Sequence, residues 1–501
     1  MSVAGPFEQR RDRVRRPRAR VSRRSVLGAA AGVGAAVGTV RLLGLDRGEL
    51  AGLEGLLRGV YTSSAGRGDW ISPLRSESAR VAHLLRRATF GATPAEFERS
   101  ASDGFSKTVD RMLESKPAPP PDFLAANDAT KGSRLNVGQL QLWWADHMLR
   151  TPTPFAERMT LFWHGHFTSD YRKVGLQTPF IYWQNLTWRE MALGDLQTML
   201  LRVTSDPAML RYLELATSTG QNPNENYARE LMELFSLGVG NYGEEDVRAA
   251  ARALAGWVEP RPDGVAEVTV DPKNQVTRRY GVFESRKTGI FVPGRAYRGG
   301  PLTFLGRTGG FDTEKVIDRI LAQPATGPFI ARKVAQHFVG ARVDDSYARR
   351  LGERFRASKY DVKSLLHAVF TSPEFLADQS YRALVKSPVE MMVHTLKALN
   401  AEGLAKLVPQ FGPSMGQVLF DPPDVGGWPN NEAWISSNSV VARVNFVSAA
   451  LAQLGGVPAG KEAPAHVDGV LGETTARLLN QAGDDRARWL LTLASPEFQL
   501  K

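Results

Sequence analysis

The sequence of 501 residues contains no cysteine. This absence excludes disulfide bonds, zinc–thiolate sites, iron–sulfur clusters and a cysteine nucleophile, although it does not assign the chain to a compartment. A Walker P-loop and an H-E-x-x-H zinc helix are also absent. The common P-loop nucleotide-binding enzymes and zinc proteases are therefore not indicated.

Basic runs are scarce beyond the first residues of the chain. The formal net charge is +11, but nine arginines fall within residues 1–24, and no comparable stretch follows Arg24. A protein that binds nucleic acid usually shows a basic stripe on its folded part. We therefore expect no nucleic-acid partner for this chain.

Long apolar runs are lacking as well. The run at 28–40 is rich in Ala and Gly and is shorter than the ~20 strongly apolar residues that a stable membrane span needs. It follows the basic stretch that ends in Arg23-Arg24, and the order is that of a twin-arginine signal. Residues 1–41 are thus predicted to be a leader; the alternative is a disordered basic arm that binds anionic lipid or nucleic acid.

The leader predicts where the protein goes. Its expected partner is the twin-arginine translocase, which exports folded cargo to the periplasm, the cell wall or the exterior. Contact with the membrane is expected only through the leader. Residues 42–75 then read as a Gly-rich connector.

The rest of the chain, 76–501, is predicted to be a single helical domain. Apolar residues recur at helical spacing, as in 81, 84, 85 and 88, and helix starts such as Thr93-Pro94-Ala95-Glu96 carry a capping residue, Pro and Glu in order. Residues 259–310 are rich in Gly, Pro and β-branched types and predict an irregular insert with a short strand or two. The expected fold is all-α, a multi-helix orthogonal array with this insert.

Several short motifs in a fixed order resemble the bacterial family DUF1800, whose function is unassigned. They lie at 83–93 (HLLRRATFGAT), 162–167 (FWHGHF), 224–235 (NENYARELMELF), 246–247 with 255–257 (DV and AGW), 303–306 (TFLG), 386–390 (KSPVE) and 422–429 (PPDVGGWP). The resemblance implies an exported bacterial protein, often paired with a sulfatase-like partner. One departure stands out: where family members commonly carry a His-Asp pair and then a Lys, this chain has Tyr297, Arg298 and Leu302.

Two histidines are the leading candidates for metal ligands. A helix is predicted over 154–162, so His164 and His166 would lie in an extended segment after it and point to one side. A divalent metal, the candidate cofactor, could bind both imidazoles, with Glu230 and Glu233 as further ligands or a general base. Arg229, the third candidate catalytic residue, could neutralise Glu233. The alternative is structural: a buried histidine and a ladder of paired charges that joins two helices.

Four further residues are candidates for ligand binding. Asn224 and Asn226 could form a hydrogen-bonding rim at a helix N-terminus, which attracts anions, or serve as ordinary turn residues. Trp428 and Trp434 could form a stacking platform for a sugar ring or a peptide, or lock their loop onto the body. His337, His367 and His394 lie among apolar neighbours and read as structural.

Two functions remain open from the sequence. The first is an exported cell-envelope enzyme, a metal-assisted hydrolase. The second is a non-catalytic binding or scaffold protein that partners an envelope enzyme or polymer.

Overall fold

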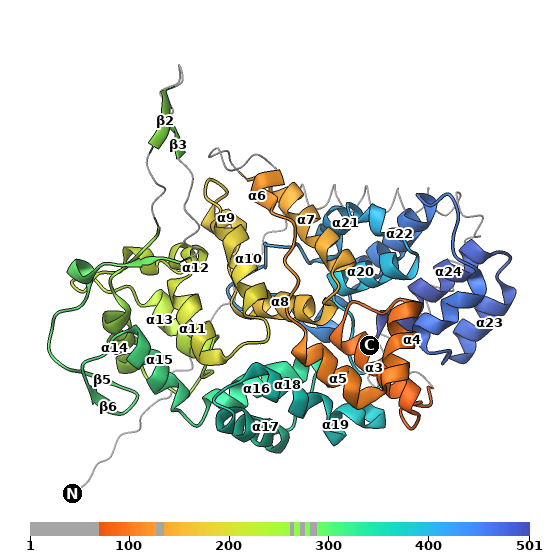
Figure 1. The fold of residues 1–501 in the computed structure, drawn as a ribbon, viewed down its shortest axis with the longest axis horizontal. Helices are drawn as coiled ribbons and strands as arrows, with labels where there is room; N and C mark the ends of the chain where they lie inside the picture. Colours follow the sequence, from red (N-terminus) through yellow and green to blue (C-terminus); the bar gives the residue numbers. More distant parts are fainter. Residues whose placement is uncertain (1–69, 127–134, 261–264, 271–275, 281–287) are drawn as a thin grey trace, which may run out of the picture. The chain divides into compact units, whose positions relative to one another are not determined.

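The computed structural model describes residues 70–126, 135–260, 265–270, 276–280 and 288–501 (Figure 1). The leader predicted at 1–41 lies outside these residues, as does the connector predicted at 42–75 except for its last part. The described residues are mostly helical, which confirms the predicted all-α class. No helix among them is long and apolar enough to cross a bilayer.

Helices fill most of the chain up to residue 254. Their bounds are α3 (Glu77–Ala88), α4 (Pro94–Asp103), α5 (Phe105–Glu114), α6 (Phe123–Ala126), α7 (Val137–Arg150), α8 (Pro154–His166), α9 (Tyr171–Val174), α10 (Phe180–Glu190), α11 (Leu196–Ser205), α12 (Pro207–Tyr212), η2 (Leu215–Thr217), α13 (Asn226–Glu233) and α14 (Glu244–Leu254).

The predicted irregular insert contains short antiparallel pairs of strands. The elements are β1 (Trp257–Val258), β2 (Val265–Val270), β3 (Val276–Tyr280), β4 (Ile290–Phe291), η3 (Pro293–Arg295), β5 (Leu302–Phe304) and β6 (Arg307–Gly309). Strand β1 pairs with β4, β2 with β3, and β5 with β6. Leu305 and Gly306 have φ of 47° and 77°, so β5 and β6 meet in a tight turn of two left-handed residues.

Helices resume after the insert and continue through the described chain. Their bounds are α15 (Thr313–Leu321), α16 (Thr326–Phe338), α17 (Asp345–Ala357), α18 (Val362–Phe370), α19 (Pro373–Leu376), η4 (Asp378–Ser380), α20 (Pro388–Ala398), η5 (Glu402–Leu404), α21 (Leu407–Met415), η6 (Asn431–Trp434), α22 (Ser437–Ala452), η7 (Gly460–Val467), α23 (Glu473–Gln481), α24 (Asp485–Ala494) and α25 (Pro496–Gln499).

Local sequence signals set several of these helix starts. The predicted start at Thr93 is confirmed: Thr93 and Glu96 form a capping box, in which each side chain bonds the other residue's backbone N–H. Ser387 and Glu390 do the same for α20, with Pro388 at the first helical position. The box holds Glu390 at the buried start of α20.

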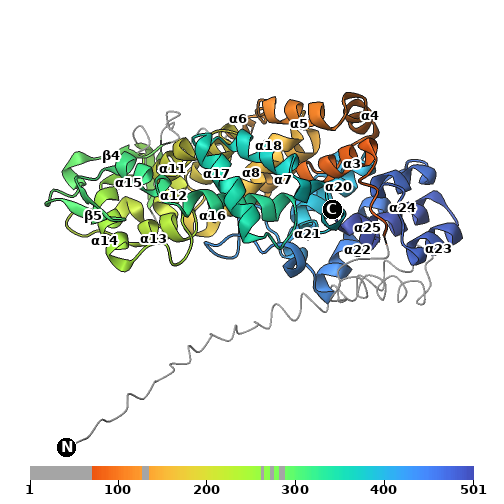
Figure 2. The ribbon, with the colours of Figure 1, turned by 90° about the horizontal axis from the view of Figure 1, so that it is seen from below.

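Helix α8 lies in the interior and organises the elements around it. Most of its residues are buried on every side, as expected of a helix with no solvated face. It packs against α10, while α16 packs against α17 and α17 against α18. Figures 1 and 2 both show α16, α17 and α18 grouped together. Helix α20 contacts α7, α21 and α22.

The segment at 384–386 is paired with residues 499–501. Val385 and Leu500 form an antiparallel bridge. The backbone N–H of Lys501 donates to the oxygen of Leu384 at 2.8 Å, and Lys386 donates to Gln499 at 2.9 Å. This pairing brings Lys501 beside the start of α20, where its side chain is buried.

Candidate functional site

Helix α8 carries both histidines that the sequence predicts as metal ligands. The helix does not end at residue 162 but continues to His166, with the N–H of Phe167 bonded to the oxygen of Trp163 at 2.7 Å. Two positions apart on a helix, side chains point to different faces. The predicted extended segment is therefore wrong, because tertiary packing of the buried residues from Trp163 on keeps them helical.

His164 lies in a dry aromatic cage. Its ring centroid is 5.1 Å from that of Trp144 and 5.4 Å from those of Phe420 and Trp428. Neither ring nitrogen has a hydrogen-bond partner in the part of the chain that the structure describes. Burial lowers the pKa of His164 to about 3, so the imidazole is neutral at physiological pH.

His166 is occupied by different partners. Its Nε2 lies 3.2 Å from the backbone oxygen of Phe235, and its Nδ1 lies 3.2 Å from Nζ of Lys333. These contacts fit one neutral tautomer, in which Nε2–H donates to Phe235 and Nδ1 accepts from the ammonium. Burial and the charge of Lys333 both lower the pKa of His166. The side chain thus joins α8 to α16 and to the end of α13.

The acidic residues of α13 form their own contacts. Arg229 pairs with Glu244 at 2.8 Å and with Glu225 at 3.4 Å rather than with Glu233. Glu233 accepts a hydrogen bond of 2.6 Å from the hydroxyl of Tyr242. Glu230 is half-buried, and burial together with the negative charge of Glu233 raises its pKa.

Asn224 and Asn226 both donate to one carboxylate. Their Nδ2 atoms lie 3.4 Å and 3.0 Å from Oε2 of Glu214, whose other oxygen pairs with Lys173 at 3.0 Å. The hydrogen bond and the charge of Lys173 lower the pKa of Glu214. The two amides therefore already hold an anionic side chain of the protein itself.

Tyr297 and Arg298 lie in the same region. The N–H of Gly220 donates to the oxygen of Arg295 at 2.7 Å, so the segment with Tyr297 and Arg298 lies beside the loop that leads into α13.

No metal site emerges from these groups. Within the described ranges, no set of three or more His, Asp or Glu side chains is arranged to hold a metal ion. His164 and His166 face different neighbours, and Glu230 and Glu233 belong to a third group. The two histidines and the two glutamates are therefore not brought together around a common metal position.

A serine pattern associated with hydrolases also lacks its geometry. The sequence G-P-S-M-G occurs at 412–416, but Ser414 is an exposed residue near the end of α21 and its hydroxyl donates to Phe411 at 2.8 Å. A nucleophile elbow requires a sharp strand-to-helix turn. Ser414 is thus a helix residue.

The loop at 421–434 lies directly against α8. Gly427 has φ of 90°, and a Cβ there would lie 2.1 Å from the backbone oxygen of Gly165. A Cβ on Gly165 would in turn lie 3.5 Å from the ring of Trp428. Glycine at 427 therefore permits a close approach that places Trp428 beside α8.

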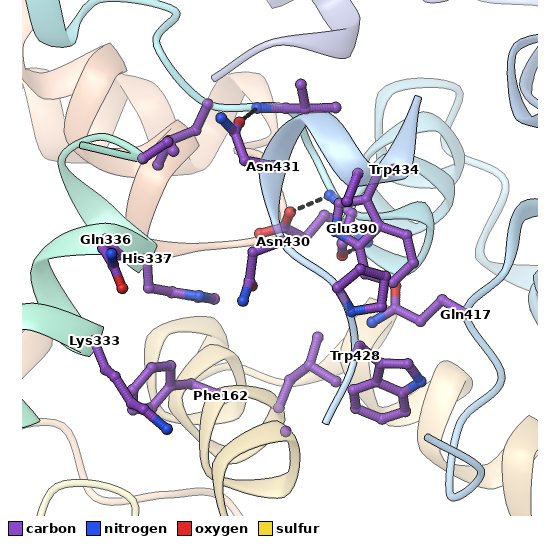
Figure 3. A pocket seen from close by; sticks show the side chains of 18 of the residues that line it. Phe162, Lys333, Gln336, His337, Glu390, Gln417, Trp428, Asn430, Asn431 and Trp434 are labelled. Carbon is purple, nitrogen blue, oxygen red and sulfur yellow. Dashed lines mark hydrogen bonds between the residues drawn. The ribbon is translucent and has the colours of Figure 1, made fainter. Parts of the chain in front are cut away.

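The two tryptophans of this loop line one pocket of about 500 Å³. Both side chains are buried, with 8% (Trp428) and 5% (Trp434) of their surface exposed. In Figure 3, Trp428, Trp434 and Gln417 lie on the right, and Phe162, Lys333, Gln336 and His337 lie on the left. The polar and aromatic lining consists of Phe162, Trp428 and Trp434; Gln336, Gln417, Asn430, Asn431 and Ser387; His166 and His337; and Arg158, Lys333, Glu390, Glu432 and Lys501.

Glu390 is the buried carboxylate of this pocket. Its Oε2 accepts the N–H of Ser387 at 2.5 Å in the capping box, and its Oε1 pairs with both Arg158 and Lys501. All three charged side chains are at least 95% buried. Glu390 is therefore committed to contacts within the protein on both of its oxygens.

Sequence reasoning located part of this pocket and missed the rest. Trp428, Trp434 and His166 were candidates, and the motifs at 162–167, 386–390 and 422–429 each contribute to the lining. Convergence of these three motifs was the available signal. Lys333 and Gln336 belong to none of the motifs, and His337, which read as structural, lines the pocket.

Comparison with known proteins gives one match. The profile of a family described as "Protein of unknown function (DUF1800)" matches residues 83–500. No curated protein and no solved structure matches the chain.

Proposed function

The chain belongs to the DUF1800 family, and we propose that it is an exported binding protein whose pocket takes one or two sugar units of a polysaccharide. The observation that carries this proposal is the combination of two tryptophans and four carboxamide side chains around one pocket. Its volume of about 500 Å³ lies within the range of ~300–1,000 Å³ typical of small-molecule sites.

The lining suits a sugar better than a wholly apolar ligand. Each carboxamide offers two N–H donors and an acceptor oxygen, so the exposed Gln336 and Asn430 can match hydroxyl groups of either polarity, whereas the oxygen of Gln417 already accepts from the N–H of Val389 at 2.9 Å. Tryptophan presents a large apolar face with one polar edge, which fits the C–H face of a pyranose ring. The exposed rim at Gln336, Asn430 and Glu432 opens the pocket to solvent.

Binding is favoured over hydrolysis because the one buried carboxylate of the pocket, that of Glu390, is already occupied. Glu390 is bonded on both oxygens, and Glu230 and Glu233, the acids predicted from the sequence, do not line the pocket. A general acid or base must reach the reacting group directly or through one water.

Export is the second part of the proposal. The paired arginines at 23 and 24 and the apolar run that follows support a twin-arginine route. A binder of envelope polysaccharide would then work beside enzymes that act on the same polymer, and the sulfatase-like partner implied by the family resemblance is one such enzyme.

The test is a glycan-binding measurement on the full chain. An array of neutral and charged oligosaccharides identifies binders, and titration calorimetry then gives their Kd. We expect at least one saccharide to bind and Gln336→Ala and Asn430→Ala to weaken it about 2- to 10-fold each, the value of one hydrogen bond. The matched control is Asn438→Ala, because Asn438 is an exposed residue of α22 that does not line the pocket.

Two results would overturn the proposal. One is that no saccharide on the array binds the chain. The other is that saccharides bind, but Gln336→Ala and Asn430→Ala bind them as tightly as Asn438→Ala does.

A further inference from the structure

Three basic side chains line the inner wall of the pocket, those of Arg158, Lys333 and Lys501. Arg158 on α8 and Lys501 at the paired segment share a single carboxylate, that of Glu390. The other oxygen of Glu390 is taken by the N–H of Ser387. One carboxylate side chain thus serves two buried basic side chains.

The contacts of Lys333 are with neutral groups. Its ammonium lies 3.0 Å from the oxygen of Leu234 and 3.2 Å from Nδ1 of His166, and both of these partners are neutral. No carboxylate of the described chain pairs with it. An ammonium has three N–H donors, so one remains for a ligand in the pocket that Lys333 lines.

A fourth basic residue, Arg87, lies behind the wall. Arg87 on α3 is fully buried, and its guanidinium donates to the backbone oxygen of Ser380 rather than to a carboxylate. Burial, then the charges of Arg158 and Arg87, lower the pKa of Lys501. An anion beside these three side chains would oppose the part of the shift that comes from their mutual repulsion.

Side-chain nitrogens without hydrogen-bond partners are also present at the pocket. Nε2 of His337, Nε of Arg158 and Nε1 of Trp428 are buried, and none has a hydrogen-bond partner among the residues described. All three residues line the pocket, and Figure 3 shows the imidazole of His337 directed into it from α16. Nε of Arg158 and Nε1 of Trp428 are donors, and a ligand with acceptor oxygens in the pocket would satisfy them.

We propose that the ligand carries a negative charge, a carboxylate, sulfate or phosphate on a sugar ring, and that this anion lies against Arg158, Lys333 and Lys501. The inference rests on the proposed function, since it names the class of saccharide that the same pocket takes. Uncompensated buried cations destabilise a protein that has no use for them, and such departures are expected at binding sites. The anion supplies the missing counterion.

The test compares matched saccharides on the full chain. A neutral disaccharide, the corresponding uronic-acid disaccharide, a sulfated and a phosphorylated derivative are each titrated by calorimetry, with inorganic sulfate and phosphate as ions without a sugar. We expect at least one anionic disaccharide to bind roughly 10- to 100-fold more tightly than the neutral one, as for hydrogen bonds to charged groups. The derivative with the lowest Kd identifies the anionic group that the pocket prefers.

Substitutions of the two lysines test whether their charges cause the preference for an anionic saccharide. Lys333→Met and Lys501→Met should each reduce the anionic preference, and Lys501→Met leaves Glu390 paired with Arg158, so the fold is maintained. Lys333→Arg retains the charge and should retain most of the preference. Thermal unfolding of each variant verifies that it is folded.

The outcomes separate the two proposals. If neutral and anionic disaccharides bind equally well, the anionic inference is overturned while the saccharide function stands. If inorganic sulfate or phosphate binds as tightly as its sugar ester, the charge on the wall is supported and the saccharide function is overturned. If no saccharide and no inorganic ion binds, both proposals fail.

Discussion

Arg189 donates two hydrogen bonds, of 2.7 and 2.8 Å, to the carboxylate of Glu157 inside the protein core. Trp144 donates a third at 2.5 Å, and His147 lies 3.3 Å away. Burial alone would raise the pKa of Glu157, but the charge and hydrogen bonds of Arg189 outweigh it and, with His147, lower the pKa to about 2. The pair joins α10 to α8, the helix that carries Arg158 and His166.

Glu157→Gln should destabilise the chain strongly. The substitution leaves Arg189, which is 3% exposed, without a counterion, and breaking a buried pair in this way costs about 3–5 kcal/mol. Urea unfolding followed by circular dichroism measures the loss. Glu225→Gln, which removes the surface pair with Arg229, is the control and should cost less than about 1 kcal/mol. Equal losses would contradict the prediction.

Asp206 should make stability depend on pH. Its Oδ1 accepts hydrogen bonds from Met209 N at 2.8 Å and Gln184 Nε2 at 2.7 Å, while Oδ2 is buried with no partner in the described chain. Burial raises the pKa of Asp206 to about 7. Because the folded-state pKa is raised, the protonated form contributes stability below pH ~4, and this contribution is lost as pH rises toward 7.

Asp206→Asn removes the titration and keeps the accepting oxygen. Its unfolding free energy should exceed that of the parent by an amount that grows about 1.4 kcal/mol per pH unit between pH ~4 and the folded pKa of about 7. Denaturation of both proteins at a series of pH values between 4.5 and 7.5 gives the difference. A difference that stays constant over this range would show that Asp206 titrates normally.

Gly427→Ala should abolish saccharide binding. A Cβ at this position would lie 2.1 Å from the oxygen of Gly165, and the φ of 90° is one that alanine rarely adopts. The loop must then move and take Trp428 out of the pocket. Gly403→Ala is the control, since Gly403 does not line the pocket and a Cβ there would meet nothing within 4 Å. Calorimetric titration compares the saccharide affinities of the two variants. Retained binding in Gly427→Ala would contradict the role assigned to Trp428 in the pocket.

Glu230→Gln should leave saccharide binding unchanged. Glu230 does not line the pocket, and its pKa is raised by burial and by the charge of Glu233. Removing the charge relieves the repulsion, so stability at pH 7 should stay the same or rise. Calorimetry and thermal unfolding measure the two quantities. A loss of binding without unfolding would restore Glu230 as a site residue.

Helices were predictable here because their signals are local. The box at Thr93 and Glu96 was read directly from four residues, and the structure confirms it. The end of α8 was not predictable from local pattern, because packing of Trp163 and His164 against other segments keeps the chain helical as far as His166. Tertiary contacts of this kind override local preference.

The pocket was harder to predict for the same reason. Arg158, Lys333 and Lys501 are far apart in the sequence, and an isolated basic residue on a helix normally reads as solvated. Only the fold shows that these residues share one wall with Glu390. The aromatic part, Trp428 and Trp434, was accessible because both lie in one short loop.

The pairing of residues 499–501 with 384–386 has a practical consequence for protein production. Lys501 is 4% exposed and lines the pocket, so a purification tag fused after it would begin at the pocket wall. Such a fusion would separate Lys501 from Glu390 or block the opening of the pocket. A failure to bind saccharide would then be caused by the tag and not by the protein itself. Affinity handles for this chain are better inserted at an exposed site remote from position 501.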